Sequence, residues 1–142
     1  MMDITIRKLT KRHKDQINEI QKQRGFVEID DSFFESQKVL YGAFHDDRLV
    51  SMAALYLYHR LPCSDYPHGF IAELGSVYTI PEYRFHGIAT MIITVILDSV
   101  KKDWLLLDAI VVDSTDDACN MYEKLGFKYS TEHRQWFVLN KY

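Results

Sequence analysis

The 142-residue sequence contains only two cysteines, three prolines and six glycines. Cys63 and Cys119 stand far apart, so the sequence predicts neither a disulfide framework nor a zinc pair. Without a secretory signal pattern, this cysteine usage favours a reducing, cytoplasmic environment. No stretch is rich in proline, glycine or serine, and no repeat recurs at a period of about 20–50 residues. We therefore expect one domain over residues 1–142, with a core drawn from the 47% of residues that are hydrophobic.

The sequence also lacks an excess of positive charge. Lysine and arginine total 17 against 20 aspartates and glutamates, which gives a net charge of -3. This balance argues against a nucleic acid or an anionic membrane surface as partner. The longest apolar run, Ile88 to Leu97, is interrupted by Thr90 and Thr94 and is too short to cross a bilayer. We expect a soluble protein without a membrane partner.

The first half of the sequence alternates between strand and helix patterns. Ile4 to Leu9 predicts a strand, and Asp15 to Arg24 predicts a surface helix that Gly25 ends. A second short helix is predicted from Ser32 to Leu40, because Ser32 and the glutamate three residues later form a capping-box pattern. Strands follow at Tyr41–Phe44, Leu49–Tyr58 and Phe70–Thr79, the first two joined by a turn at His45, Asp46 and Asp47.

The second half predicts a parallel strand pair. Ile88 to Val100 is apolar on nearly every face, which is typical of a helix packed between layers. Leu105 to Val112 is a continuous apolar run broken only by Asp108, as in a strand buried on both faces. Because a strand, a helix and such a strand form a right-handed crossover, the fold class is α/β with a mixed sheet. A helix at Asp116–Leu125, closed by Gly126, and a hairpin from Phe127–Ser130 and Gln135–Leu139 complete the chain.

The stretch PEYRFHGIAT, from Pro81 to Thr90, stands where the strand leads into the apolar helix. The first amides of a helix have no intrahelical partner, and its dipole places partial positive charge there, so a phosphate fits. Gly87 lets the backbone approach an anion, Ala89 is small, and Arg84 adds a fixed charge with forked donors. Alone, this pattern is also that of an ordinary helix start with a solvated arginine.

Its context is more specific, because the buried strand that follows leads to NMYEKLGF at Asn120–Phe127. Together these residues resemble the GNAT superfamily of acyl-CoA-dependent N-acetyltransferases over essentially the whole chain. The resemblance implies a largely antiparallel mixed sheet with a central parallel strand pair splayed apart, flanked by about four helices. It also implies that acetyl-CoA is the acyl donor and that an amine is the acceptor.

The resemblance further implies which residues bind the coenzyme. The pyrophosphate would be held by backbone amides of Arg84, Phe85, His86, Gly87, Ile88, Ala89 and Thr90. The pantetheine arm would lie along Ser76 to Thr79, which includes Val77 and Tyr78. An asparagine that often contacts this arm is replaced here by Thr115, with Ser114 beside it, and either hydroxyl is a candidate substitute. Tyr122, Gly126 and Phe127 match the family's other signature.

The chemistry requires a base and an acid. An amine must be neutral to attack a thioester, and the departing thiolate needs a proton. Glu73 is the candidate base, since it stands eleven residues before Arg84, as the base does in the histone-acetylating branch, and in a strand expected to be buried. Tyr122 is the candidate acid. Structural alternatives are a strand-end glutamate in solvent or an ion pair, and a tyrosine that packs beside its apolar neighbours.

Other residues have weaker claims. Asp108 and Asp113 are alternative bases, although Asp108 also suits a buried structural acceptor. His59, Cys63 and His68 lie in a loop and lack a fourth ligand, so no metal site is predicted. Trp136 to Val138 suit either a core or a homodimer interface.

The acceptor is the least specified part. In GFVEIDDSFFES, from Gly25 to Ser36, acids alternate with aromatic residues, which suits a cationic amine or merely a solvated helix entry. We expect an N-acetyltransferase acting on a primary amine of a small molecule or peptide. The alternatives are a non-catalytic acyl-CoA sensor or scaffold, and an acetyltransferase for a protein terminus or another macromolecule.

Overall fold

The computed structural model describes residues 2–36, 38–104, 106–115, 118–130 and 136–140. Seven strands form a mixed sheet in the order β1-β2-β3-β4-β5-β7-β6. The chain divides into two compact units, Met1–Ala54 with Ser76–Val95, and Leu55–Gly75 with Ile96–Tyr142. Strands β3 (Arg48–His59) and β4 (Phe70–Thr79) and helix α2 (Ile88–Asp103) each contribute residues to both units.

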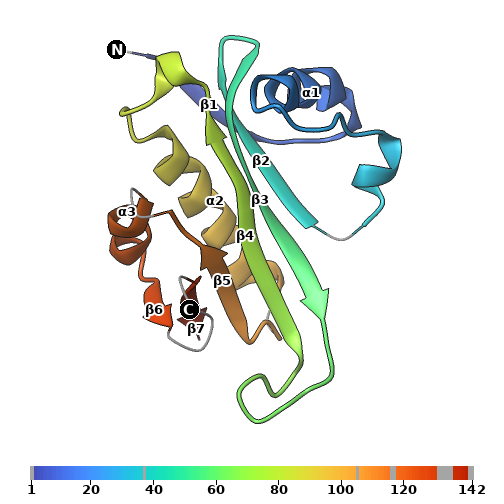
Figure 1. The fold of residues 1–142 in the computed structure, drawn as a ribbon, viewed down its shortest axis with the longest axis vertical. Coiled ribbons are helices and arrows are strands. Elements are labelled where there is room, and N and C mark those ends of the chain that lie inside the picture. The colour runs from blue at the N-terminus through green and yellow to red at the C-terminus, as the bar shows by residue number, and fades with distance from the viewer. Residues whose placement is uncertain (1, 37, 105, 116–117, 131–135, 141–142) are drawn as a thin grey trace. The chain divides into compact units, whose positions relative to one another are not determined.

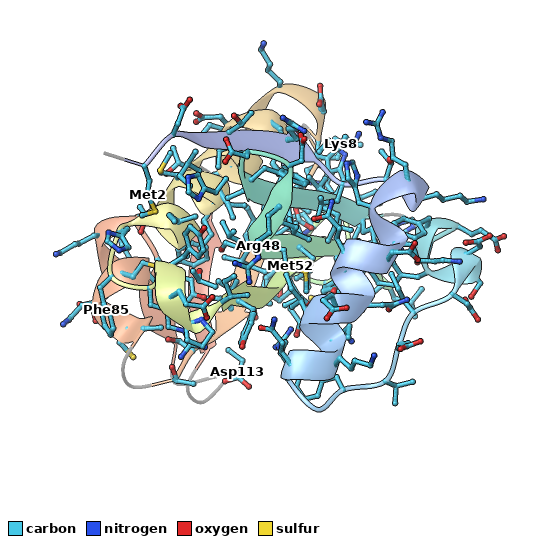
Figure 2. The ribbon with its side chains drawn as sticks, turned by 90° about the horizontal axis from the view of Figure 1, so that it is seen from above. Met2, Lys8, Arg48, Met52, Phe85 and Asp113 are labelled. Carbon is cyan, nitrogen blue, oxygen red and sulfur yellow. The ribbon has the colours of Figure 1, made fainter. Side chains whose placement is uncertain are left out.

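In the first unit, strand β1 (Ile4–Lys8) pairs antiparallel with β2 (Lys38–His45), from Ile4 opposite His45 to Lys8 opposite Tyr41. Helix α1 (Lys14–Gln23) lies on one side of these strands and the first turns of α2 lie on the other (Figures 1 and 2). Ile17 and Ile20, one helical turn apart, are both buried, which is why this amphipathic helix packs on the sheet. The predicted helix over 15–24 is confirmed.

The short helix predicted from Ser32 to Leu40 is wrong. A 3₁₀ turn spans only Asp31–Phe34, and its cap is Asp30, whose side chain accepts a hydrogen bond from the Ser32 amide. The chain then extends into β2, where Leu40 is buried. The capping-box letters predicted a longer helix, but the β-branched and aromatic residues from position 39 onward gain more by pairing with β1. The predicted strand was therefore too short at its start.

The second unit contains the parallel pair. Strand β4 pairs parallel with β5 (Ala109–Asp113), from Ile71 opposite Ala109 to Leu74 opposite Val112. Strand β5 also pairs antiparallel with β7 (Trp136–Asn140), which pairs antiparallel with β6 (Lys128–Ser130). Residues Ala109 to Val112 of β5 are all at most 2% exposed, as a strand between two neighbours requires. The parallel pair and the final hairpin are confirmed, with Gln135 outside the described residues.

The buried strand begins later than predicted, although Leu105, the predicted first residue, lies outside the described residues. Leu106 is 56% exposed, and β5 begins only at Ala109, after Asp108. Helix α2 ends three residues later than predicted, at Asp103, and its Ile92, Ile93 and Ile96 are fully buried. Helix α3 (Cys119–Lys124) is shorter than the predicted Asp116–Leu125, whose first two residues lie outside the described part of the chain. Three α-helices are therefore described, against the four expected.

Candidate functional site

The candidate anion site of the first unit begins where β4 ends. Ile80 is 1% exposed, and its amide donates a hydrogen bond to the Val50 carbonyl, so the chain leaves the strand from a fixed point. A 3₁₀ turn at Pro81–Tyr83 follows, with proline in its first turn, where a missing N–H costs nothing. The chain then passes through Arg84 to Gly87 into α2. This is the segment in which the sequence predicted a phosphate site.

Two residues of this turn have left-handed backbone conformations. Phe85 has φ +66° and Gly87 has φ +74°. Successive N–H groups in a turn can form a concave, anion-binding arrangement. Phe85 is bulky, pays roughly 1–3 kcal/mol for this conformation, and has a fully exposed side chain on the outer side of the turn (Figure 2). Backbone strain that is not accompanied by burial of the side chain is typical of a functional segment.

Glycine is required at position 87 because φ is positive there, and not because a larger side chain would clash. A Cβ atom built on it would meet no heavy atom within 4 Å. Its carbonyl accepts the first α2 hydrogen bond, from the Met91 amide at 3.1 Å. The amides of Ile88, Ala89 and Thr90 therefore precede the intrahelical ladder and lie at the positive end of the dipole. Because Ile88 is buried, these donors are held in place.

A cavity of about 590 Å³ adjoins this turn. It is lined by Met2, Asp3, Ile4, His86, Ile88 and Met91. His86, which was predicted to lie beside the phosphates, is therefore on the cavity side. The carboxylate of Asp3 makes the cavity itself unfavourable for phosphate. The amides of the turn are the better anion donors.

Arg84 is turned toward the end of β4. Its Nε donates a hydrogen bond to the Thr79 carbonyl at 2.9 Å, and its Cζ lies 5.4 Å from the centre of the Tyr78 ring. One of the five guanidinium N–H groups is thus used to hold the turn against the strand. That Arg84 contacts a phosphate stays a prediction. Its two terminal nitrogens are the groups that would make this contact.

The predicted pantetheine segment, Ser76 to Thr79, is also held by the first unit. Ser76 has φ +51°, a bulge-like conformation within β4. The buried Ser51 hydroxyl donates to the Tyr78 carbonyl at 3.0 Å and lies 2.7 Å from the Thr79 hydroxyl. Val77, Tyr78 and Thr79 are all half-buried. The strand end is rigidly attached to β3 within this unit.

Sequence reasoning missed the support of the turn by the β2–β3 hairpin. The Tyr83 hydroxyl and His45 Nδ1 form a hydrogen bond of 2.6 Å, and the two rings meet edge to face. Beside them, Arg48 pairs with Glu82 at 3.5 Å. Both contacts fix the two residues immediately before Arg84. No local pattern marks His45 for this role, because it lies 38 residues away in the sequence.

Glu73, the predicted base, belongs to the second unit. It lies on β4 opposite Val111 and is half-buried. The Tyr58 hydroxyl donates a hydrogen bond to Glu73 Oε1 at 3.3 Å. Burial, and then the Glu73 charge, raise the pKa of Tyr58 above its usual value. The role of Glu73 as the base stays a prediction.

Tyr122, the predicted acid, is 4% exposed. Burial raises the pKa of its phenol to about 12. The structure also explains the signature that contains it: Gly126 has φ +100° and ends the helix, and the Phe127 amide donates to the Tyr122 carbonyl at 3.0 Å. The Phe127 ring then packs edge to face on Tyr122, 5.7 Å away. The signature therefore fixes one buried phenol.

The two candidates for the missing asparagine differ. Ser114 is buried, and its hydroxyl donates to the Thr115 carbonyl at 2.8 Å. The Cys119 thiol also reaches that carbonyl, at 3.4 Å. Thr115 itself is exposed. Since the Ser114 hydroxyl is used locally, Thr115 is the better candidate for a ligand contact.

Asp108 has the structural role that the sequence offered as its alternative. Its side chain is 5% exposed and accepts from the His68 and Gly69 amides at 2.9 and 2.8 Å and from His68 Nδ1 at 2.8 Å. Burial opposes ionisation, but these hydrogen bonds outweigh it and lower the pKa of Asp108. Such a carboxylate is a poor base. Asp113, the other alternative, is exposed.

Two further expectations concern metals and membranes. Among the described residues, no group of three or more histidine, cysteine or acidic side chains is placed to hold a metal ion. His59 instead stacks on Phe70, with ring centres 4.0 Å apart. In the part of the chain that the structure describes, no helix has both the length and the apolarity to cross a membrane.

Solved structures share this fold over nearly the whole chain. A predicted acetyltransferase from Clostridium acetobutylicum, crystallised with acetyl-CoA, is 20% identical, with 92% of this chain and 93% of that chain covered and a TM-score of 0.75. Arabidopsis thaliana NAA60 with acetyl-CoA is 13% identical, with 98% and 99% covered and a TM-score of 0.74. A GNAT family acetyltransferase from Brucella melitensis with acetyl-CoA is 14% identical, with 100% and 90% covered and the same TM-score.

No curated protein matches the chain. The sequence model of the acetyltransferase (GNAT) family, however, matches residues 5–127. That range begins in β1, includes the turn at Gly87 and ends at Phe127 of the second signature. The chain belongs to the GNAT acetyltransferase family.

Proposed function

We propose that the chain transfers an acetyl group from acetyl-CoA to a primary amine of a small molecule or peptide. One observation carries the proposal: the strained turn Phe85–Gly87 presents amides at the start of α2 in a GNAT chain. Three proteins of similar fold were crystallised with acetyl-CoA, which supports the same donor here.

The amides of residues 86–90 would hold the coenzyme's pyrophosphate. A hydrogen bond from a backbone amide to a charged oxygen contributes about 1.5–3 kcal/mol, so four or five of them hold a diphosphate against water. Preorganisation matters as much as number, because donors that are already fixed lose little entropy on binding. The His45–Tyr83 hydrogen bond and the buried Ile88 provide that rigidity from either end of the turn.

In the proposed reaction the neutral amine attacks the thioester carbonyl. A nitrogen–carbon bond forms, the carbon–sulfur bond breaks, and the sulfur leaves with the bonding electron pair. Glu73, directly or through a water, takes the proton that the nitrogen loses, and the thiolate gains one proton to become the free thiol. General acid–base help of this kind contributes about 10²–10⁴ in rate for each group.

The raised pKa of Tyr122, about 12, bears on the role that we propose for it. A phenol of this pKa remains protonated at every physiological pH, so it can always donate a hydrogen bond to sulfur. An ordinary thiol has a pKa of about 8.5, so full proton transfer from such a phenol to a thiolate would be uphill by about 5 kcal/mol. We therefore assign Tyr122 the stabilisation of the developing thiolate, with the proton arriving from the base or solvent.

The test combines binding with turnover. Calorimetry is expected to show acetyl-CoA binding, and a panel of amines is expected to release free thiol. Tyr122→Phe is expected to retain binding and lose at least about tenfold in kcat. Tyr41→Phe, which removes the hydroxyl of a half-buried tyrosine in β2, is the control. Absence of coenzyme binding would end the proposal, and binding without turnover on any amine or protein extract would make the chain an acyl-CoA sensor.

A further inference from the structure

Two tyrosines of β3 lie beside Glu73 in the second unit. The Tyr58 hydroxyl donates a hydrogen bond to Glu73 Oε1 at 3.3 Å. The Tyr56 ring lies against β4 two positions further on, because its Cε2 and Cδ2 atoms would be 3.4 and 3.8 Å from a Cβ atom built on Gly75. Burial, then the Glu73 charge and hydrogen bond, and then Tyr56 raise the pKa of Tyr58. The carboxylate and the two phenol groups are therefore close neighbours.

Glu73 faces away from the buried side of β4. Ala72 and Leu74 are at most 2% exposed, whereas Glu73 and Gly75 are half-buried. Side chains of a strand alternate between its two faces, so the glutamate and the glycine share the less buried face. Tyr58 is 52% exposed, so its ring adds aromatic surface beside the carboxylate that a ligand can reach.

The cation that such a carboxylate requires is missing from the described part of the chain. There, Glu73 makes no ion pair, and its hydrogen bond comes from a neutral phenol. A carboxylate that is partly removed from water is stabilised by a positive partner. The second unit also contains seven lysines and arginines against ten aspartates and glutamates, so the net charge of -3 belongs to this unit. Charge of this sign attracts cationic ligands.

We propose that Glu73, Tyr58 and Tyr56 bind the acceptor as an ammonium ion, so that the preferred acceptors are amines that carry no carboxylate beside the amino group. Aromatic rings attract ammonium ions through their negative faces, and the carboxylate adds the opposite charge. A second carboxylate, on the ligand, would be repelled by Glu73. The inference rests on the proposed function, in which the bound ammonium gives one proton to Glu73, and through it to solvent, and the neutral amine then attacks.

The binding test compares choline with 3,3-dimethylbutan-1-ol, which has the same shape but a neutral carbon in place of the charged nitrogen. Each is titrated into the full chain without coenzyme or acetyl donor, so neither turnover nor coenzyme binding is needed. The amide chemical shifts of the protein report the Kd. Choline is expected to bind about tenfold or more tightly than the alcohol, because only choline carries the charge.

Three variants separate the contributions. Glu73→Gln, which keeps the shape, is expected to weaken choline binding about tenfold or more. Tyr58→Leu should weaken it about threefold to tenfold, and Tyr58→Phe, which keeps the ring, should stay within about threefold of the wild type. Asp98→Asn removes an exposed charge from α2 in the same unit and should change the Kd by less than about twofold.

Equal binding of the two probes, no binding of choline, or an equal loss in Glu73→Gln and Asp98→Asn would overturn the inference. With acetyl-CoA, kcat/KM is compared for phenethylamine and phenylalanine, which differ by one carboxylate, and phenethylamine is expected to be favoured about tenfold or more. A preference for phenylalanine would also overturn the inference, although acetyl transfer had been observed. Choline binding with no thiol release from any amine would contradict the proposed function and leave the ammonium site standing.

Discussion

Gly87→Ala offers the sharpest test of the turn, because the chain contains a matched control. Gly87 has φ +74° and Gly25 has φ +72°, and a Cβ atom on either would meet no heavy atom within 4 Å. The two substitutions therefore impose the same local strain and no steric clash. Only Gly87 lies in the turn that would bind the coenzyme.

The magnitude follows from the backbone conformation. Placing a Cβ on a left-handed residue costs about 1–2 kcal/mol, and alanine recovers about 0.4–1 kcal/mol by restricting the unfolded chain. Each variant should thus lose about 1 kcal/mol of unfolding free energy, or about 2–4 °C in Tm. If the alanine that replaces Gly87 relaxes toward negative φ to relieve the strain, the neighbouring amides turn away. Losing two hydrogen bonds of about 1.5–3 kcal/mol each raises the Kd by about 100-fold or more.

The assay is calorimetric titration with acetyl-CoA, alongside thermal unfolding of each variant. Gly87→Ala should weaken binding by about two orders of magnitude, while Gly25→Ala, equally destabilised, should bind within about twofold of the wild type. A D-alanine in place of Gly87, introduced by ligation, accepts positive φ and should restore both properties. The reasoning fails if folded Gly87→Ala binds as the wild type does, or if Gly25→Ala loses as much affinity as Gly87→Ala.

Three further outcomes follow from contacts away from the amides. Tyr83→Phe removes the hydrogen bond to His45 and should raise the acetyl-CoA Kd about threefold to tenfold, with no added effect when His45 is also replaced. Asp108→Asn should lower the unfolding free energy by about 1–3 kcal/mol at pH 7; because the folded pKa of Asp108 is lowered, the wild type's advantage persists above the ordinary value of 3.8 and should vanish in acid titrations as pH falls below it. Gly69→Ala places a Cβ 2.1 Å from a backbone carbonyl oxygen and should abolish folding or cost well over about 2 kcal/mol in denaturant unfolding, so a near-neutral result would contradict the structure.

Local periodicity was enough to predict most elements. The apolar face of α1, the buried α2 and the continuous apolar strand are dictated by burial, and burial is what periodicity reports. The prediction failed between Ser32 and Leu40, where a local capping pattern competed with pairing to a strand that comes far earlier in the chain. It also failed at Leu106 and Leu107, because apolar letters alone do not show where Asp108 must accept loop amides.

The residues of the candidate site also fall into two groups, those that a local sequence pattern predicts and those that only the tertiary structure brings together. Gly87 and the Tyr-x-x-x-Gly-Phe signature could be predicted because each meets a local structural requirement. Gly87 supplies a left-handed residue, and the signature ends a helix. The contacts of His45 with Tyr83 and of Arg24 with Tyr78 join residues that are 38 and 54 positions apart, so no window of sequence contains them. Pairings of this kind depend on tertiary structure and have no local sequence pattern.

Because distant residues hold the turn in place, the short motif of residues 81–90 is not a binding site by itself. The turn stores strain at Phe85 and Gly87, and an isolated chain would release it by leaving the left-handed region. Ile80, Tyr83 and Ile88, which attach it to the strand, the hairpin and the core, hold the amides in place before any ligand arrives. A peptide of residues 81–90 should therefore show no measurable acetyl-CoA affinity. Submicromolar binding by such a peptide would mean that the local sequence, and not the surrounding unit, preorganises the turn.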